Sequence, residues 1–443
     1  MRSWRGLAAL PPGLREQLLH VFNPSAVLEL FPDTSGIEDG VLRVGGVSTV
    51  DLAGEYGTPL VVYCEETVRA AARAWRRGAG EGVVVYGTKA FPNAPLMKVL
   101  WDEGIGADAS TLGEMKYAEA AEIPPSRWVV HGNNKSDEEL RFAAEKDAWL
   151  VVMDEPGEVE RCVELGVRRV LLRVTPGIEA GAHTAIQTGH IGSKFGVPPE
   201  DAPDVIRRAR DTGLELLGLH VHLGSQLVDD APARTAVEWL AGFCAELAAE
   251  LDWTPQILNL GGGLGIRYTL DDPPPPAPED YARTLTERVA HAWSVQNLPS
   301  PQLVFEPGRS LVGRAGLTLY RVGVVKRSGP TTWVAIDGGM SDNPRPALYG
   351  SRYSALLANR ADEAPTGVFA VCGKHCESGD VLIERAGLPE PRRGDLVAVP
   401  CTGAYTLAMA SKYNAVARPP AALVMDGARL IAPRDEALEA ARR

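Results

Sequence analysis

Apolar and polar positions through the middle of the chain form a repeating pattern of a short apolar run followed by a longer amphipathic segment. Short apolar runs bounded by turn residues are typical of buried strands, and apolar residues spaced three and four apart are typical of helices. Eight strands are predicted in this way: VVVYGTK (83–89), GADAS (106–110), WVVHG (128–132), WLVVM (149–153), RVLLRV (169–174), LLGLHVHLG (216–224), ILNLGGG (257–263) and QLVFEPG (302–308). This repeat predicts a parallel (β/α)8 barrel, with a doubly wound sheet as the structural alternative.

The pattern changes after about residue 312, where short β-rich runs follow one another with turns between them. These runs are LTLYRVGVVKR, TTWVAID, GVFAVCG, DLVAVPCTG and AALVMDGARLI. We expect a mainly antiparallel β domain over 313–443, joined by 25–62, so that the barrel over 63–312 is inserted between its parts. Residues 1–24 are interpreted as an N-terminal helical extension. The predicted fold class is therefore α/β, a TIM-like barrel plus a mainly antiparallel β domain.

Composition limits the partners that the protein can have. Lys plus Arg total 45 against 57 Asp plus Glu, a formal net charge of −12 over 443 residues, which argues against binding to nucleic acid or to an anionic membrane. No apolar run approaches the roughly 20 residues that span a bilayer, and the amino terminus lacks a signal-peptide pattern. The six cysteines are scattered through the chain, so we expect reduced thiols in a cytoplasmic protein.

Candidate catalytic residues follow the predicted barrel strands. Lys89 ends VVVYGTK, and an amine at the carboxyl end of a barrel strand suits a Schiff base, because burial there lowers the pKa of a lysine. An ordinary surface lysine is the alternative. His220 and His222 would share one face of their strand. They could belong to a metal site, although further ligands are not evident, or one imidazole could stack on a cofactor ring.

Two further motifs suit an anionic ligand. Glycines 261–263 allow close approach of backbone N–H groups to phosphate oxygens, but a tight turn explains them equally well, and their spacing is not that of a dinucleotide fingerprint. Glu306 and Arg309 offer an anion for a ring nitrogen and a cation for a phosphate. A surface ion pair is the alternative for these two residues.

The β domain also carries polar motifs, namely DGGMSD (337–342), CESGD (376–380) and GAY (403–405). Cys372, His375 and Cys376 could suggest a metal site. Such a site needs a second pair of ligands, and none is evident. No metal is therefore predicted.

Taken together and in this order, the motifs resemble those of the fold type III pyridoxal-phosphate-dependent decarboxylases, and most closely the diaminopimelate decarboxylase family. The resemblance runs from about Asp51 to Pro419 and rests on YGTKAF, ADASTLGEM, HGNNKS, GLHVHLGSQ, LGGGLGIRY, EPGRSLVG, DGGMSDNPRPALYG, GKHCESGD and TGAY followed by SKYN. It implies an alanine racemase-like fold, a pyridoxal 5′-phosphate cofactor and a homodimer with shared active sites. The implied reaction is decarboxylation of meso-2,6-diaminopimelate to L-lysine and CO2.

The resemblance also implies roles for individual residues. Lys89 would hold the cofactor as a Schiff base, and Cys376 of the partner subunit would be the proton donor. Expected cofactor contacts are Asp108 near the lysine, His222 stacked on the ring, Glu306 on the pyridine nitrogen, and Ser225, Gly263, Arg309 and Tyr405 on the phosphate, with Gly262 beside them. Expected substrate contacts are Arg309, Arg345, Tyr349, Glu377 and Tyr405.

Other functions stay open on the sequence alone. An alanine racemase would carry an arginine at the ring nitrogen, so Glu306 and the Cys376 motif argue against it. An ornithine- or arginine-type decarboxylase acts on a substrate that ends in a cation, whereas Arg345 and Tyr349 with Glu377 suit a distal centre bearing both a carboxylate and an ammonium group. A decarboxylase of a specialised amino acid is a further alternative. An inactive cofactor-binding regulator would be expected to have lost Lys89 or Cys376, and both are present.

Overall fold

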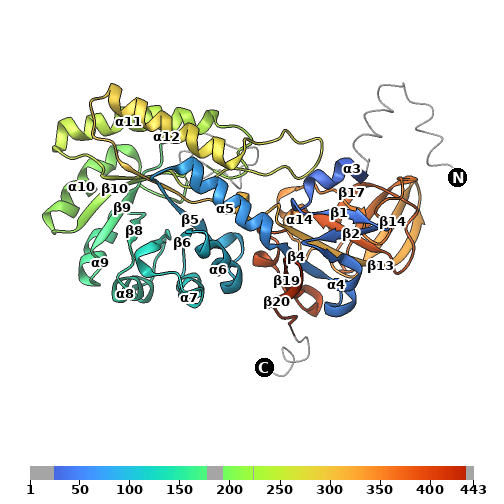
Figure 1. Ribbon diagram of the computed structural model, residues 1–443. Helices are drawn as coiled ribbons and strands as arrows, with labels where there is room; N and C mark the ends of the chain where they lie inside the picture. The colour runs from blue at the N-terminus through green and yellow to red at the C-terminus, as the bar shows by residue number, and fades with distance from the viewer. Residues whose placement is uncertain (1–23, 177–192, 223, 436–443) are drawn as a thin grey trace. The chain divides into compact units, whose positions relative to one another are not determined.

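The computed structural model describes residues 24–176, 193–222 and 224–435 (Figure 1). The predicted N-terminal extension over 1–24 lies outside the described residues except for its last position. The chain forms two compact units, one of residues 1–68, 266–274 and 312–443 and one of residues 69–265 and 275–311. The domain limits predicted at residues 62/63 and 312/313 stay predictions.

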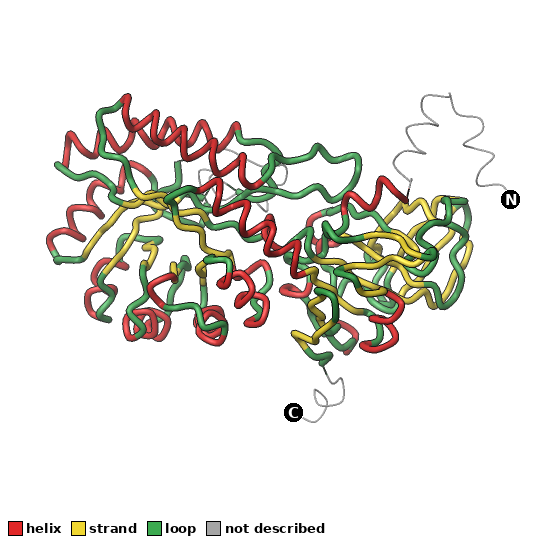
Figure 2. The backbone as a smooth tube through the Cα atoms, in the orientation of Figure 1, coloured by secondary structure: helices red, strands yellow, loops and turns green. Residues whose placement is uncertain are grey.

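The unit of residues 69–265 and 275–311 is a closed barrel of parallel strands in the order β10-β11-β12-β5-β6-β7-β8-β9. Its strands are β5 (Val83–Gly87), β6 (Gly106–Ala109), β7 (Trp128–Val130), β8 (Leu150–Met153), β9 (Arg169–Arg173), β10 (Glu215–His220), β11 (Ile257–Asn259) and β12 (Gln302–Phe305). The strands lie inside a ring of helices (Figure 2). The predicted (β/α)8 barrel is confirmed, and closure of the barrel excludes the doubly wound sheet.

The amphipathic segments between the strands form the surrounding helices, because their apolar residues recur at helical spacing and are buried on one face. In α5 (Glu65–Ala79), Val68, Ala72, Trp75 and Ala79 recur every three or four residues and are all buried. The other helices after the strands are α6 (Ala94–Asp102), α7 (Leu112–Ala120), α8 (Asp137–Glu145), α9 (Glu158–Glu164), α10 (Ala202–Asp211), α11 (Ala231–Leu251) and α12 (Pro278–Val295). A capping box of Ser136 and Glu139 fixes the start of α8.

Except for β8, the barrel strands end earlier than predicted, and the polar residues of the candidate site follow these ends. Apolar side chains such as Val85, Val152 and Val304 fill the interior. The polar residues of each motif come at the last strand position or just after it: β5 ends at Gly87, before Lys89, and β12 ends at Phe305, before Glu306. Loops after parallel strands meet at one end of a barrel, which is where active sites of this fold lie.

The other unit is mainly antiparallel, as predicted. Its strands are β1 (Gly36–Glu38), β2 (Val41–Val44), β3 (Val47–Ser48), β4 (Leu60–Cys64), β13 (Gly316–Ser328), β14 (Thr331–Ile336), β15 (Leu356–Leu357), β16 (Gly367–Cys372), β17 (Val381–Leu388), β18 (Leu396–Pro400), β19 (Ala421–Val424) and β20 (Ala428–Ala432). Strand β4 pairs with both β13 and β19, so the segment before the barrel belongs to this sheet. Among the described strands of this unit, only the β4–β19 and β14–β16 pairings are parallel.

Strand β17 was not expected from the sequence. Its segment VLIERAGL has two charged residues at its centre, both exposed, and this interrupts the apolar run. Pairing with β16 holds it in the sheet, with Leu382, Ile383, Ala386 and Leu388 buried in the core. Tertiary pairing thus decides the conformation of this segment where the local pattern does not.

Candidate active site

Lys89 lies in a single 3-10 turn, Thr88–Ala90, directly after β5. Its side chain is exposed, so the burial that the sequence analysis expected for this amine is not found. The strand already ends at Gly87, and Lys89 follows it in the turn. The position at a strand's carboxyl end is as predicted.

Asp108, at the end of β6, is the buried acid next to this lysine. Burial raises the pKa of Asp108 to about 6, and the charges of His131 and Lys89 oppose that rise. Its Oδ1 atom has no hydrogen-bond partner among the described residues. The prediction that Asp108 lies near Lys89 agrees with this electrostatic interaction, while its role towards a cofactor stays a prediction.

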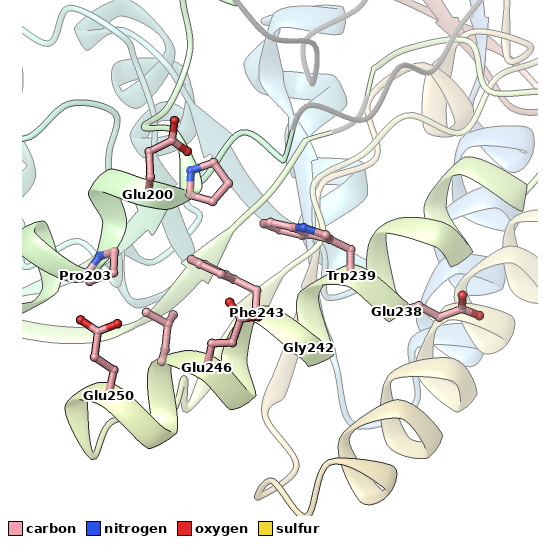
Figure 3. A pocket seen from close by; sticks show the side chains of 10 residues that line it. Glu200, Pro203, Glu238, Trp239, Gly242, Phe243, Glu246 and Glu250 are labelled. Atoms are coloured by element: carbon pink, nitrogen blue, oxygen red, sulfur yellow. The ribbon is translucent and has the colours of Figure 1, made fainter.

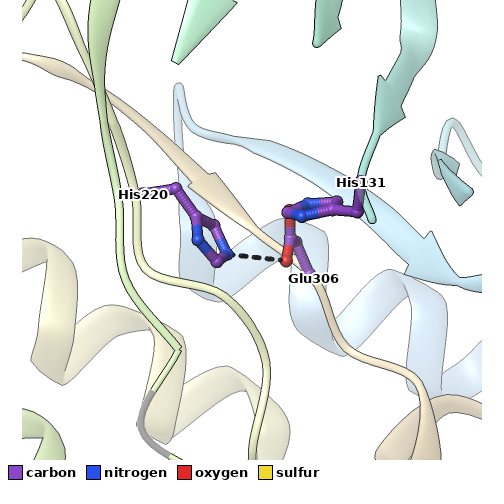
Figure 4. Close-up of side chains that lie close together, drawn as sticks. All are labelled: His131, His220 and Glu306. Carbon is purple, nitrogen blue, oxygen red and sulfur yellow. Dashed lines mark hydrogen bonds and ion pairs between the residues drawn. The ribbon is translucent and has the colours of Figure 1, made fainter. Parts of the chain in front are cut away.

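Glu306 is the centre of a hydrogen-bonded cluster inside the barrel mouth (Figure 4). Its Oε1 atom accepts hydrogen bonds from His131 Nε2 at 2.6 Å and from Asn259 Nδ2 at 2.6 Å. Its Oε2 atom pairs with His220 Nε2 at 3.3 Å. The two imidazole rings meet edge to face, with centroids 4.7 Å apart. All four side chains are buried.

Burial and hydrogen bonding shift the pKa values of Glu306 and His220. Burial alone would raise the pKa of Glu306, but its electrostatic interactions and hydrogen bonds with His131 and His220 together hold it well below its ordinary value. Burial lowers the pKa of His220 to about 4, so that its ring is neutral at neutral pH. An ionised carboxylate therefore faces the barrel mouth.

His131, His220 and Glu306 also lie close enough together to ligate a metal ion. The amide of Asn259, however, also donates to Glu306 Oε1. A donor aimed at that oxygen favours the hydrogen-bonded interpretation of the cluster.

His222 lies two residues beyond His220, where β10 ends, so the strand alternation expected to place both histidines on one face stops before it. Its Nδ1 atom accepts a hydrogen bond from the Gly262 N–H at 3.2 Å. Burial lowers the pKa of His222 well below its ordinary value, which leaves a neutral imidazole. The backbone N–H of Gly261 likewise donates to Asn259 Oδ1, at 2.9 Å. Two of the glycine N–H groups thus position site side chains.

The glycines are also required for close packing at the strand ends. A Cβ atom on Gly262 would lie 2.3 Å from the Glu306 carbonyl oxygen, and one on Gly263, which has φ +118°, would lie 3.0 Å from the Gly224 carbonyl oxygen. Only glycine fits both positions. The backbone there approaches the Glu306 strand end as closely as it can.

Ser225 and Arg309 come together beside these glycines. Arg309 Nη2 donates to Ser225 Oγ at 2.9 Å, and the arginine is buried. A buried guanidinium and a hydroxyl next to Gly263 make a suitable binding site for a phosphate group.

Lys135 is the buried lysine of this unit, and it serves a structural role. Its ammonium group donates to the carbonyl oxygens of Gly132 and Val152 at 2.6 and 2.7 Å and pairs with Glu158 at 2.9 Å. All three donors of a lysine are thereby used. Lys135 is therefore not suited to act as a nucleophile.

Cys376 and Glu377 belong to the other unit, in the loop after β16, and both are exposed. The Cys376 N–H donates to Asn414 Oδ1 at 2.9 Å. Buried Asp380 fixes the loop, since its carboxylate accepts hydrogen bonds from the N–H groups of Met340 at 2.7 Å and His375 at 2.9 Å. This one aspartate thus joins the DGGMSD and CESGD motifs.

Cys376 lines a cleft of about 680 Å³. The other lining residues are Thr58, Pro59, Asp337, Lys374, Asn414, Ala415, Val416, Ala417 and Arg434. His375, which precedes Cys376, accepts a hydrogen bond at Nε2 from the Ser341 N–H. Because Cys376 is exposed and lines this cleft, its thiol is accessible to a ligand there.

Arg345 begins the short helix α14 (Arg345–Tyr349), which places Tyr349 one turn further on as expected. The guanidinium is buried in its own unit: it stacks 4.4 Å from the centroid of the Tyr268 ring, and its Nη1 atom donates to Tyr353 Oη at 2.7 Å. The aromatic partners were not foreseen, because Tyr268 is far from Arg345 in sequence. Tyr405 has a left-handed backbone with φ +59°.

A second surface pocket, of about 640 Å³, runs along α11 in the barrel unit (Figure 3). Trp239 and Phe243 stack at its floor with centroids 5.0 Å apart. Among the described residues that line it, Glu200, Glu238, Glu246 and Glu250 are the charged ones, and none is a cation. The strand-end site is therefore the better candidate for catalysis.

The residues at the barrel mouth fit pyridoxal phosphate. Ser225 and Arg309 suit its phosphate, ionised Glu306 suits a ring N–H, neutral His222 suits the ring face, and Lys89 suits its aldehyde. Among the described residues, the buried atoms Asp108 Oδ1 and His220 Nδ1 have no hydrogen-bond partner, as expected next to a polar ligand. His131 and Asn259 were not singled out from the sequence, although both lie within predicted strands, and His220 was considered only together with His222, as a metal ligand or a stacking ring.

Fold and site together define an enzyme that binds pyridoxal phosphate on a (β/α)8 barrel. Residues 65–313 match the family model described as "Pyridoxal-dependent decarboxylase, pyridoxal binding domain". The chain is 41% identical over 426 residues to a diaminopimelate decarboxylase of Actinosynnema pretiosum subsp. auranticum, covering 94% of this chain and 95% of that protein. It is 42% identical over 412 residues to that of Bacillus subtilis, covering 90% and 94%.

A solved structure gives the same result. The crystal structure of diaminopimelate decarboxylase from M. jannaschii in complex with L-lysine superposes with a TM-score of 0.85 at 31% identity, covering 92% of this chain and 96% of that one. The chain belongs to the pyridoxal-dependent decarboxylase family and, within it, to the group of the diaminopimelate decarboxylases. Its cofactor is pyridoxal 5′-phosphate. No helix in the described parts of the chain is both long and apolar enough to cross a membrane.

Proposed function

We propose that the protein decarboxylates meso-2,6-diaminopimelate to L-lysine and CO2. The observation that carries the proposal is the cluster of ionised Glu306 with Ser225 and Arg309 at the end of a barrel that also carries Lys89. The relatives that share nine-tenths of the chain are named for this reaction.

Each residue at the barrel mouth has a separate proposed role. Pyridoxal phosphate, when bound, accepts the electron pair that departing CO2 leaves behind. Lys89 supplies the amine that holds it, and Ser225, Arg309 and Gly263 hold its phosphate. Ionised Glu306 keeps a proton on the ring nitrogen, and neutral His222 covers the ring without adding a competing charge.

Cys376 is the proposed proton donor to the substrate carbon that loses CO2. Its thiol is exposed in the cleft of the β-rich unit, and the hydrogen bond from its N–H to Asn414 fixes the backbone that carries it. Glu377, also exposed, would meet the distal ammonium group of the substrate. Tyr349, Tyr405 and Arg345 complete the proposed substrate contacts.

The proposed substrate can be tested by CO2 release from meso-diaminopimelate, ornithine, arginine and lysine at equal concentrations. We expect kcat/KM to be highest for meso-diaminopimelate, by roughly 30-fold to several thousand-fold, because the others lack the distal carboxylate that an arginine would pair with. A higher kcat/KM for ornithine or arginine would replace this function with that of a related decarboxylase.

We propose a homodimer whose active sites combine Lys89 of one subunit with Cys376 of the partner subunit. Mixing Lys89→Ala and Cys376→Ala proteins should then restore up to about a quarter of wild-type activity, since random pairing gives half mixed dimers with one intact site each. The measurement is CO2 release after subunit exchange, with exchange proven by mass-tagged subunits. Each variant alone is the control. Full exchange without recovery would mean that each site is built within one chain.

A cytoplasmic location is part of the same proposal. All six cysteines lie in the described part of the chain and are free thiols. Free thiols of this number are typical of a reducing compartment.

A further inference from the structure

Glu306 is held by more donors than a single contact with a cofactor requires. An ionised carboxylate has about four acceptor sites, two on each oxygen. His131 and Asn259 fill both sites on Oε1, and His220 fills one on Oε2. One acceptor site is left, and it is on Oε2.

We infer that His131, His220 and Asn259 are positioning residues, which occupy three acceptor sites of Glu306 and reserve the fourth for the ring N–H of the cofactor. The inference deepens the proposed function and rests on it. The three donors come from the ends of three different strands, β7, β10 and β11, while Glu306 follows β12. Closure of the barrel therefore fixes the carboxylate from several directions, as Figure 4 shows for the two imidazoles on either side of it.

The donors also decide where the shared proton stays. Each hydrogen bond stabilises the ionised carboxylate more than the neutral acid. Glu306 becomes a weaker base, so the proton remains on the ring nitrogen, where it makes the ring a better electron acceptor. An apolar residue at position 131 or 220 would fill the same space without this effect.

Other charges around the carboxylate do not replace these donors. The titratable and charged groups that interact with Glu306 are Asp108 of β6, His131 after β7, Arg173 of β9, His220 of β10 and His222 after β10. Arg173 pairs with Asp154 at 3.5 Å, and Lys89 acts on Asp108 and His222. Among the described side chains, hydrogen bonds to the Glu306 carboxylate come from His131, His220 and Asn259.

The test compares His131→Leu and His220→Leu with His131→Gln and His220→Gln in the full-length holoenzyme. Leucine removes the donor, whereas glutamine keeps a side-chain N–H of similar reach. His291→Leu is the matched control, because His291 is an exposed histidine of α12. The first readout is the infrared carboxyl signal of Glu306 against pH, assigned by its loss in Glu306→Gln. The second is the pH dependence of the visible absorbance, and the third is kcat and KM.

We expect each leucine variant to move the midpoint of the Glu306 signal up by about one to two pH units, the effect of losing one hydrogen bond to a charged group. The visible absorbance should become pH-dependent over the same range. A fall in kcat of about 10- to 100-fold with a smaller change in KM should accompany it. The glutamine variants should show clearly smaller changes than the leucine variants, and His291→Leu should stay close to wild type.

Two results would overturn the inference: glutamine variants as impaired as leucine variants, or leucine variants with an unshifted Glu306 signal. If a leucine variant fails to fold, Asn259→Ala removes the third donor and carries the same expectation, and an unshifted signal there is equally decisive. The spectra are recorded without substrate. A wrong substrate assignment would therefore leave them unchanged and would appear only in the CO2 panel.

Discussion

Lys89→Ala should be a colourless protein that releases no measurable CO2, with kcat reduced on the order of a thousand-fold or more because the covalent attachment is lost. The measurements are the visible absorbance of the purified protein and CO2 release from meso-diaminopimelate. Lys116→Ala is the matched control, since Lys116 is an exposed lysine on α7 and should leave both unchanged. Thermal unfolding should show that all three proteins are folded.

Borohydride reduction of the wild-type holoenzyme tests the same assignment without a mutation. The label should appear on the peptide that contains Lys89. Lys135 is the other lysine to compare, because it is buried in the barrel unit. All three hydrogen-bond donors of its ammonium group already contact Gly132, Val152 and Glu158, so we expect no label there. Label on Lys135 or on another lysine would refute the role of Lys89.

The fold was predictable because its determinants are local. Each barrel strand is a short apolar run, and the helices between them repeat apolar residues at helical spacing. The errors fall where local pattern and tertiary pairing differ: β10 ends at His220 although the apolar run continues, and β17 forms although two charges interrupt it. Those limits are set by neighbouring strands.

From the sequence, a candidate site residue could be predicted only where its residue type and its position at a strand end by themselves suggest a chemical role. Lys89, Glu306 and Arg309 each stand at a strand end with an evident chemical use. The contributions of His131, His220 and Asn259 depend on four strand ends meeting around one carboxylate. That coincidence exists only after the barrel has closed, so no local pattern could reveal it.

Arg345 illustrates how burial changes a prediction about specificity. The sequence suggested a guanidinium free to meet the distal carboxylate of the substrate. In the structure the guanidinium is stacked on Tyr268 and donates to Tyr353. One nitrogen is thus fixed by Tyr353, which would orient the rest of the planar group towards a ligand. The role of Arg345 in substrate binding stays a prediction, and its test must separate binding from packing.

Arg345→Ala should lower kcat/KM for meso-diaminopimelate, because a desolvated distal carboxylate would lose its charged partner. The loss should correspond to about 2–5 kcal/mol of transition-state stabilisation. The activity on lysine and ornithine, which lack that carboxylate, should change little, so the preference between the two substrate types narrows. Arg345→Lys keeps the charge but loses the two-pronged contact, and we expect an intermediate loss. Tyr353→Phe removes only the hydroxyl that orients Arg345, so it should raise KM for meso-diaminopimelate with little effect on kcat.

Arg352→Ala is the matched control for these variants. Arg352 lies in the same unit, its side chain is 60% exposed, and its ion pairs with Asp271 and Asp272 are at the surface, where such pairs contribute little. It should leave both kcat/KM values unchanged. Cofactor absorbance and thermal unfolding of each variant show whether the barrel site and the fold are intact. An equal loss for all substrates in Arg345→Ala would mean that the arginine only packs against Tyr268 and Tyr353, and an unchanged kcat/KM for meso-diaminopimelate would remove Arg345 from the specificity site altogether.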